Sequence, residues 1–395
     1  MGLKPVAEGA DRGLIMYEIL LGDCLESLSA LESESVDTCI TSPPYYNLRD
    51  YGEDKQIGLE SSIGEYIDNM VAVMRQVRRV LKPTGTLWLN IGDSYNGSGG
   101  AGGDYNEGGK REGQKKYGRK DEANLKPKDL MMIPARLALA LQKDGWYLRQ
   151  DIIWAKPACM PEPVKDRCSK NHEYIFLLSK ERHYYYDSHA IREPNADAGR
   201  TDYTAGKRTK KGAAQNGNPD RRDNDLWERS KDFTPNGRNK RSVWWITPKP
   251  YKGAHFAVFP PDLIEPCVLA GTSAKGCCSE CGAPYERQTE GVADKPPSIN
   301  KKASMTQTGG VGTERLNGSQ KRYHTVGWKA TCECEADITP CTVLDPFGGS
   351  GTTAGVAIKH GRKAILCELN EEYVSLIPKR IESITGFKET EIEWV

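Results

Sequence analysis

The chain has 395 residues and a formal net charge of +1, with 37% apolar and 28% charged residues. This composition is that of a globular protein, so it excludes a wholly disordered or fibrous chain, and any nucleic-acid surface must come from local clusters of charge. No apolar run approaches the roughly 18 residues of a membrane-spanning helix, and the acidic residues near the N-terminus are unlike a secretory signal. Twelve cysteines, several of them inside apolar runs, predict buried thiols in a reducing, cytoplasmic compartment.

The first patterned block, residues 17–187, alternates predicted strands and helices. Short apolar runs at 17–21 and 36–41 predict buried strands. The capping box Ser62–Glu65 begins a helix with apolar residues at three-and-four spacing, and Pro83 should end it. The elements that follow are a strand at 86–91, a helix at 133–142, and strands at 147–154 and 173–178. This alternation predicts an α/β sheet with helices on both faces.

Polar stretches divide the chain. Residues 96–128 are rich in glycine and nearly free of aliphatic side chains, which predicts a long loop. Residues 188–241 are also polar, and a further polar insertion, expected to have little order, covers 288–325. We therefore expect a first half at 17–187, a separate region at 188–241, and a second half at 242–395.

A glycine-rich turn near the C-terminus is the first feature that points to a ligand. A short strand ends at Asp345, glycines follow at 348, 349 and 351, and a predicted helix then extends to Gly361. The next strand, 364–367, is followed by Glu368, which stands 23 positions after Asp345. Glycine lets the backbone approach a ligand closely, and an acid after the second strand can accept hydrogen bonds from ribose hydroxyls.

Three interpretations of this turn compete. A P-loop would need a lysine before its Ser or Thr, and a dinucleotide site would need G-x-G-x-x-G, so both are disfavoured. A purely structural strand-to-helix turn stays open on the short motif alone. The carboxylate of Asp345 favours a ligand with a cationic amino-acid tail over a pyrophosphate, and S-adenosylmethionine is such a ligand.

The tetrapeptide Ser42-Pro43-Pro44-Tyr45 directly follows the predicted strand 36–41. Open α/β sheets place their sites just past strand ends, and proline has no N–H, so the local carbonyls are free to accept hydrogen bonds. With the Ser42 hydroxyl as an acceptor and the Tyr45 ring as a flat face, the tetrapeptide could hold an exocyclic amino group on a stacked base. Alone, it could also be a proline-stiffened loop.

Together the two motifs resemble those of the amino-methylating DNA methyltransferases, the N4-cytosine and N6-adenine family. Three further segments resemble parts of this family. Residues 21–25 resemble its adenine-contacting acidic turn, 87–93 resemble the strand beside its catalytic motif, and 254–271 resemble the segment that in this family closes over the methionine part of the cofactor. Because the catalytic motif precedes the cofactor motif, the order resembles the permuted, beta-type arrangement. The resemblance implies a Rossmann-like, doubly wound methyltransferase sheet, circularly permuted, with an inserted recognition region.

The resemblance also assigns roles to residues. The catalytic residues would be Ser42, Pro43, Pro44 and Tyr45. The implied contacts of S-adenosylmethionine are Asp23, Phe259, Asp345, Phe347, Gly348, Gly349, Gly351, Thr352 and Glu368. One departure from the family pattern is Pro378, which should kink the last helix.

The implied reaction acts on a flipped-out nucleotide, because a base amino group inside a duplex cannot reach a sulfonium methyl. Tyr45 would stack on the base while Ser42 Oγ and the Pro43 carbonyl accept hydrogen bonds from its amino group, which frees the nitrogen lone pair for in-line transfer. Carbon-5 methylation would need a cysteine nucleophile, and neither Cys267 nor Cys341 lies at a plausible catalytic turn. In this family, a serine at the first position of the tetrapeptide usually accompanies methylation of cytosine N4. We therefore favour cytosine N4 as the target, and adenine N6 is the alternative.

Two more distant functions stay open. One is a catalytically inactive, zinc-containing nucleic-acid-binding protein, against which the two intact motifs argue. The other is methylation of RNA or of a protein side-chain amide. Amide-methylating enzymes usually begin their tetrapeptide with asparagine, where this chain has Ser42.

Four cysteines predict a structural zinc site in a small, ribbon-like insertion at 277–334. These cysteines are Cys278, Cys281, Cys332 and Cys334. The first pair has the spacing of a zinc knuckle and precedes Gly282, whereas the second pair is tighter. Four thiolates satisfy tetrahedral zinc and leave no position for water, so the role would be structural. The alternative is four reduced thiols on a surface hairpin, and Cys277 could substitute as a ligand.

The region 188–241 is predicted to contact DNA. It carries thirteen Lys or Arg against eight Asp or Glu, a net charge of +5 in a nearly neutral chain. Lys and Arg supply phosphate contacts, and Arg and Asn can read base edges, although a solvated insertion without function is the simpler alternative. The residues assigned to DNA are Lys207, Arg208, Lys210, Lys211, Arg221, Arg222 and Asn224, with 96–128 as a helper loop. The expected partners are double-stranded DNA and a cognate restriction endonuclease, and no membrane.

Overall fold

The computed structural model describes residues 17–53, 55–97, 125–159, 162–193, 238–249, 258–293 and 321–387. They divide into two compact units. The larger comprises the described residues of 1–187, 241–286 and 330–395, and the smaller those of 188–240 and 287–329. Every motif discussed above lies in the larger unit, apart from the proposed DNA-binding region.

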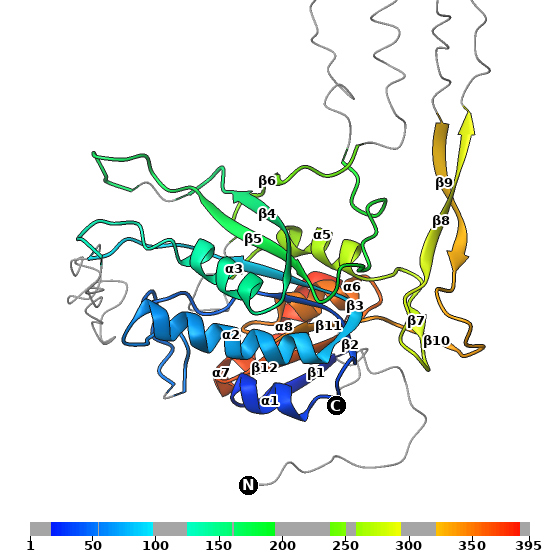
Figure 1. Cartoon of the computed structure of the whole chain (residues 1–395), viewed down its shortest axis with the longest axis horizontal. Coiled ribbons are helices and arrows are strands. Elements are labelled where there is room, and N and C mark those ends of the chain that lie inside the picture. The colour runs from blue at the N-terminus through cyan, green and yellow to red at the C-terminus, as the bar shows by residue number, and fades with distance from the viewer. Residues whose placement is uncertain are drawn as a thin grey trace, which may run out of the picture. The chain divides into compact units, whose positions relative to one another are not determined.

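Among the described residues, an eight-stranded sheet forms the centre of the larger unit (Figure 1). Its strands lie in the order β1-β12-β11-β2-β3-β5-β4-β6. Their bounds are β1 Tyr17–Leu21, β2 Val36–Thr41, β3 Leu81–Ile91, β4 Tyr147–Ala155, β5 His172–Ser179, β6 Val243–Trp245, β11 Thr342–Asp345 and β12 Lys363–Glu368. The first five strands in this order are mutually parallel, so their carboxyl ends meet at one edge of the sheet. Strand β5 is antiparallel to both β3 and β4, and β6 is parallel to β4.

Helices cover both faces of this sheet, as the strand and helix alternation predicts. One face carries α1 Cys24–Ala30, α2 Ile63–Val80 and α3 Ile133–Lys143, and the other carries α5 Pro261–Gly271, α6 Thr352–Lys359 and α8 Ile377–Thr385. The first face buries Met70 and Met74 of α2 in one core with Leu87 of β3. On the other face, a Cβ added to Gly271 would lie 2.8 Å from Thr38 Oγ1, so glycine lets α5 pack directly on the strands.

The helix and strand boundaries differ from the expected ones at two prolines. Helix α2 ends at Val80, and Pro83 lies inside β3, which begins at Leu81 rather than at Thr86. The kink expected at Pro378 is wrong. The short helix α7, Glu371–Val374, ends before this proline, and Pro378 lies in the first turn of α8. Backbone N–H groups in a first turn have no intrahelical partner, so the proline costs the helix no hydrogen bond.

Two small sheets accompany the central one. In the larger unit, β7 Cys277–Cys278 pairs antiparallel with β10 Ile338–Thr339. The strands β8 Glu286–Ala293 and β9 Lys321–Lys329 pair with each other, and apart from Glu286 they lie in the smaller unit. The polar stretch 288–325 was expected to lack order, but the structure has strands at both of its ends, while residues 294–320 lie outside the described part.

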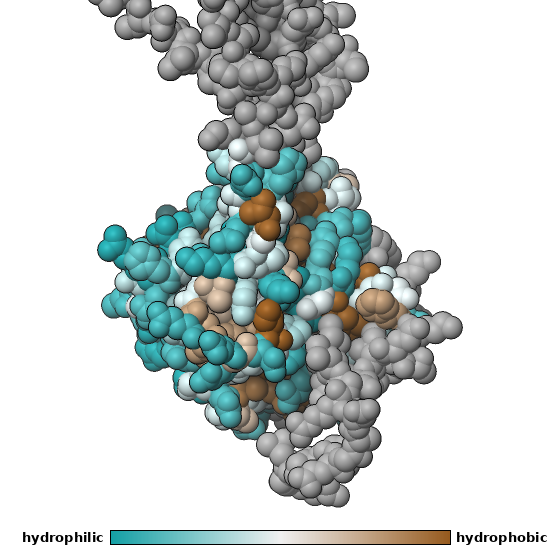
Figure 2. All heavy atoms as spheres, turned by 90° about the vertical axis from the view of Figure 1, so that its right-hand side faces the viewer, coloured by the Kyte–Doolittle hydropathy of each residue, from teal (hydrophilic) through white to brown (hydrophobic). Residues whose placement is uncertain are grey.

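The described helices include none that is long and apolar enough to cross a membrane. Figure 2 shows one face of the molecule, where apolar side chains are scattered among hydrophilic ones. All twelve cysteines carry free thiols, and seven of them are buried. The expectation of buried thiols is therefore confirmed.

Candidate active site

A pocket lies at the carboxyl ends of the parallel strands β1, β12, β11 and β2. Residues at or just after the end of each strand line this pocket, among them Asp23, Ser42, Phe347 and Glu368. The two sequence motifs therefore meet in one site. Thr41 and Asp345, 304 positions apart, are joined there by a hydrogen bond of 2.6 Å from Oγ1 to Oδ1.

Asp345 organises the glycine-rich turn. Its carboxylate accepts hydrogen bonds from Thr41 Oγ1, from Thr353 Oγ1 at 2.7 Å and from the Phe347 N–H at 3.1 Å. Only 1% of the residue is exposed, and this burial raises the pKa of Asp345 to about 7. The side chain thus fixes the start of the turn and lines the pocket at the same time.

The glycines of the turn have separate tasks. Gly349 has a φ of +52° and its N–H donates to Glu368 Oε2 at 2.6 Å. Gly351, with a φ of +83°, caps α6, and a Cβ there would lie 2.8 Å from Ile377 Cγ2. Gly351 is the one predicted cofactor residue that does not line the pocket. It allows α8 to pack against the turn.

Two further acids are held by backbone N–H groups. Besides Gly349, Glu368 accepts a hydrogen bond from the Asn370 N–H at 3.0 Å, and burial raises its pKa. Asp23 caps α1, because its Oδ1 accepts from the N–H of Leu25 at 2.9 Å and of Glu26 at 3.1 Å. Both acids line the pocket at the ends of the neighbouring strands β12 and β1.

The tetrapeptide forms another part of the same pocket. Ser42 Oγ donates to the Tyr45 hydroxyl at 3.4 Å, and that hydroxyl donates to Glu173 Oε2 at 2.8 Å. Burial, followed by the charge of Glu173, raises the pKa of Tyr45 well above its ordinary value. Tyr66 donates to the Pro44 carbonyl at 2.9 Å, so this carbonyl already has a partner.

Sequence reasoning missed the residues around Tyr45. Glu173 also pairs with Lys156, whose ammonium lies 4.1 Å from the centroid of the Trp154 ring. All three side chains line the pocket. Gly92, just after β3, makes room for the tyrosine, because a Cβ there would lie 2.6 Å from Tyr45 Cε2. Glu173 could have been found from the sequence, because it is a charged residue near the start of an otherwise apolar strand.

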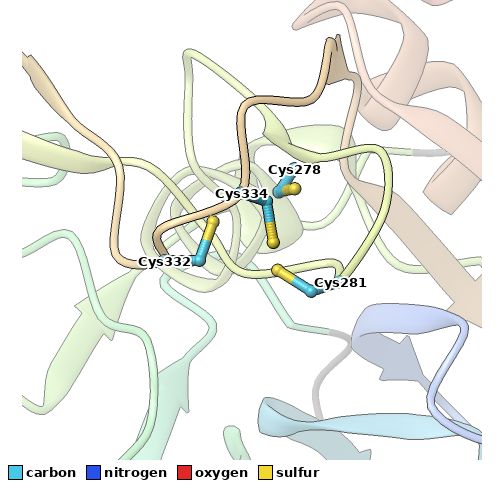
Figure 3. A group of neighbouring side chains, drawn as sticks. All are labelled: Cys278, Cys281, Cys332 and Cys334. Atoms are coloured by element: carbon cyan, nitrogen blue, oxygen red, sulfur yellow. The ribbon is translucent and has the colours of Figure 1, made fainter.

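The four cysteines assigned to zinc come together in the larger unit (Figure 3). Their Sγ atoms all lie within 4.8 Å of one another. The backbone N–H groups of Cys281 and Glu280 lower the pKa of Cys278 to about 7. Cys277 is not part of this group, because its Sγ accepts a hydrogen bond from Lys82 Nζ at 3.3 Å.

The residues assigned to DNA contact, from Lys207 to Asn224, lie outside the described residues. The helper loop is described only at its ends. There the Asn96 side chain donates to the Leu125 carbonyl at 2.9 Å, and the Lys128 N–H donates to the Asn96 carbonyl at 2.8 Å. The two ends of 96–128 are therefore hydrogen-bonded to each other.

Comparison with known proteins extends these observations. The family model described as DNA methylase matches residues 36–278 and 341–379. The Type II methyltransferase M.SmaI of Serratia marcescens is 38% identical over 95% of this chain and 94% of its own length. M.Cfr9I of Citrobacter freundii, also a Type II methyltransferase, is 36% identical over 94% of this chain and 88% of its own length.

Among solved structures, PvuII DNA methyltransferase (cytosine-N4-specific) matches with a TM-score of 0.50 and 16% identity, covering 96% of this chain and 94% of its own. At this identity the likeness concerns the fold, and it confirms the predicted methyltransferase sheet. The predicted family is confirmed by the sequence matches. The chain belongs to the amino-methylating (N6/N4) DNA methylase family.

Proposed function

We propose that the chain transfers a methyl group from S-adenosylmethionine to the exocyclic N4 amino group of a cytosine flipped out of duplex DNA. One observation carries the proposal: a single pocket is lined both by the glycine-rich turn with its acidic strand ends and by Ser42–Tyr45. The first set suits a cationic nucleoside cofactor and the second suits an amino group. Family membership and the Type II methyltransferase relatives support this reaction.

The residues at the glycine-rich turn fit S-adenosylmethionine, which supplies an electrophilic methyl group. Glu368 would accept hydrogen bonds from the ribose hydroxyls, because each of its oxygens has a second lone pair beyond the one used by the backbone. Asp23 would contact the adenine, while Phe347 and Phe259 give the pocket apolar walls. The negative charge of ionised Asp345 would favour the cationic amino-acid tail.

At the tetrapeptide, the hydrogen-bond directions suit an incoming amino group. Ser42 directs its hydroxyl hydrogen to Tyr45, so the lone pairs of its Oγ are available to accept. Tyr66 holds the Pro44 carbonyl, and the Pro43 carbonyl would be the second acceptor. Two acceptors would orient the amino nitrogen and free its lone pair, so positioning supplies most of the catalysis.

The polar pair beside Tyr45 would hold the base. Glu173 fixes the tyrosine hydroxyl and thereby the plane of the ring on which the base stacks. Lys156 uses one of its three N–H donors on Glu173, and it lines the pocket together with Trp154. We expect it to donate to an acceptor on the Watson–Crick edge of the base, N3 or O2 in cytosine.

Identification of the methylated nucleoside tests the choice of cytosine over adenine. DNA from a host that expresses the chain, digested to nucleosides and analysed by mass spectrometry, should contain N4-methylcytosine. DNA from the same host expressing Ser42→Ala at an equal protein level is the matched control and should contain much less. If N6-methyladenine is the sole new nucleoside, the choice of cytosine is wrong, whereas the family assignment is unaffected.

The region 188–241 would supply DNA contact, on the basis of its net charge of +5. Replacing Lys207, Arg208, Lys210 and Lys211 together by alanine should weaken duplex binding and flatten its salt dependence, because each phosphate contact releases counterions. Cofactor binding should not change. A variant that binds and methylates its target like the parent at physiological salt would show that this stretch has another role.

A cognate restriction endonuclease is the further partner that we propose, because the similar proteins are named Type II methyltransferases. Methylation by this chain would then protect the sites that the endonuclease cuts. The test is digestion of host DNA by candidate endonucleases with and without expression of the chain. Protection should depend on Ser42.

A further inference from the structure

We propose that Cys278, Cys281, Cys332 and Cys334 bind a zinc ion that has no part in methyl transfer. Their four Sγ atoms lie within 4.8 Å of one another. Tetrahedral zinc with bonds of about 2.3 Å needs sulfur atoms about 3.8 Å apart, so only small side-chain rotations are required. Figure 3 shows the four side chains approaching one another from two separate turns.

Backbone contacts already hold the first turn in the shape of a knuckle. The Cys278 N–H donates to the Ala283 carbonyl at 2.9 Å, and the Gly282 N–H donates to the Cys278 carbonyl at 3.0 Å. Gly282 has a φ of +71°, and a Cβ there would lie 2.8 Å from Lys82 Cε. Both the backbone conformation and the close contact therefore require glycine at this position. The turn therefore presents two thiols in a fixed arrangement.

The second turn is tied to the first without any metal. The Ser279 N–H donates to the Asp337 carbonyl at 2.9 Å, and Thr331 Oγ1 donates to the Pro284 carbonyl at 2.7 Å. Strands β7 and β10 add an antiparallel pairing beside them. Because the turns are joined in this way, binding a metal costs little ordering of the chain.

The chemistry of the four donors selects the metal. Thiolates are soft ligands that favour zinc over calcium or magnesium, and four of them leave no open position, so the site is structural. Cys281 is exposed and the second pair is half-exposed. Close thiols at the surface without a metal would be prone to oxidation.

A second group with metal-binding side chains, Asp37, Cys277 and Cys341, also lies within 4.8 Å. Its carboxylate is already satisfied by Lys82 Nζ at 2.8 Å and by the Thr342 N–H at 2.7 Å. The buried lysine supplies the positive charge that a cation would otherwise supply. We therefore assign the metal to the four-cysteine group alone.

The place of the ligands in the chain defines what the metal does. The two cysteine pairs flank residues 287–329, so zinc would clamp the two ends of this segment. None of the four cysteines lines the pocket. Removal of the metal should lower the stability of the protein while S-adenosylmethionine still binds with a nearly unchanged Kd.

Metal content tests the assignment directly. The full chain, purified without chelator, should contain about one zinc per chain by elemental mass spectrometry. The double variant Cys332→Ser with Cys334→Ser should lose most of it. Cys159→Ser and Cys168→Ser, which remove exposed thiols outside the cluster, should keep it. Zinc retained by the double variant, or lost equally from the controls, would overturn the proposal.

A second measurement avoids variants that fail to fold. Cobalt exchanged into the parent protein should give the intense visible absorption of a tetrahedral tetrathiolate centre, with charge-transfer bands from four sulfurs. An octahedral cobalt spectrum would overturn the site. So would a parent protein without metal whose four cysteines are found in disulfides.

Discussion

The cofactor end and the base end of the pocket are held by different kinds of contact. At the cofactor end, Asp23 and Glu368 are fixed by backbone N–H groups, several of them within three positions along the chain. At the base end, side chain holds side chain, and Tyr45 is bonded to Glu173, 128 positions away. The first arrangement depends mainly on correctly formed turns, whereas the second depends on the register of distant strands.

This difference predicts that the two functions can be separated by mutation. Changes at the base end should affect methyl transfer and leave cofactor binding intact, because no contact of Asp23 or Glu368 passes through Tyr45. Changes in the glycine-rich turn should affect both. Each base-end variant below is therefore measured twice, for binding of S-adenosylmethionine and for the rate of methylation under single-turnover conditions.

The largest effect is expected for Ser42→Ala. Loss of one acceptor that orients the amino group should slow methylation by about 100- to 1,000-fold. Binding of S-adenosylmethionine should stay within about twofold, because Ser42 contacts Tyr45 rather than the acidic strand ends. Ser29→Ala, which removes an exposed hydroxyl bonded to the Glu26 carbonyl, is the control and should be neutral. A fully active Ser42→Ala enzyme would contradict the role of the tetrapeptide.

Gly92→Ala should have the next largest effect. The new methyl group would lie 2.6 Å from Tyr45 Cε2, so the ring must move. Since a displacement of about 1 Å near the reacting groups can cost on the order of 100-fold, methylation should slow by roughly that factor.

Gly64→Ala is the matched control for Gly92→Ala. Gly64 lies in α2, where a Cβ would meet nothing closer than Ser62 Oγ at 3.8 Å, and alanine favours the helix. If both alanine variants behave alike, then Tyr45 does not need its observed position. Thermal unfolding of each variant shows whether a loss of rate is a loss of fold.

A smaller effect, about tenfold, is expected for Glu173→Gln. The glutamine oxygen can still accept from the Tyr45 hydroxyl, but Lys156 loses its charged partner. Tyr45→Phe should cost about as much, and the double variant should be little slower than either, because both changes break one network. Glu181→Gln, at an exposed position after β5, serves as the control. Additive effects of the two changes would show that the residues act independently.

Much of this site could be predicted because its key residues are contiguous in the sequence. Ser42–Tyr45 and the turn after Asp345 are local patterns, and their strand context follows from short apolar runs. Parallel packing of β2 beside β11 then brings the two motifs together. Gly351 was assigned to the cofactor because it belongs to the glycine-rich turn. In the structure this glycine makes room for α8 to pack against the turn.

Glu173, Lys156 and Trp154 could not be found in this way. They reach the pocket because β5 is antiparallel to β3, so the start of β5 lies at the same edge as the carboxyl ends of the parallel strands. The register that pairs Trp154 with Glu173 places both beside the tetrapeptide. Strand direction is a tertiary property, and an apolar run of residues does not encode it.

The missed strands have a different cause. The first part of β3 contains Pro83 and Gly85, which normally indicate a turn, but pairing of Leu81 with Val36 extends the strand. Strands β8 and β9 are mostly polar, so they carry no apolar alternation from which a strand could be predicted. In both cases pairing with another segment decides the structure.

The last and smallest effect concerns the pH dependence of stability at the cofactor end. Burial raises the pKa of Asp345 from 3.8 to about 7, so the folded state favours its protonated form. This contribution to stability is complete below the unfolded-state pKa and is lost as the pH rises through about 7. Between about pH 6 and pH 8 the loss amounts to roughly 1 kcal/mol.

Asp345→Asn removes this titration and keeps the shape of the side chain. Urea unfolding of parent and variant at several pH values should therefore show a parent that loses stability relative to the variant as the pH rises. Binding of a cationic cofactor favours the ionised carboxylate, so S-adenosylmethionine should bind the parent more tightly at pH 8 than at pH 6. The variant should lack that dependence. Equal pH profiles for the two proteins would mean that Asp345 is already ionised when the turn is folded, and that its three hydrogen bonds outweigh its burial.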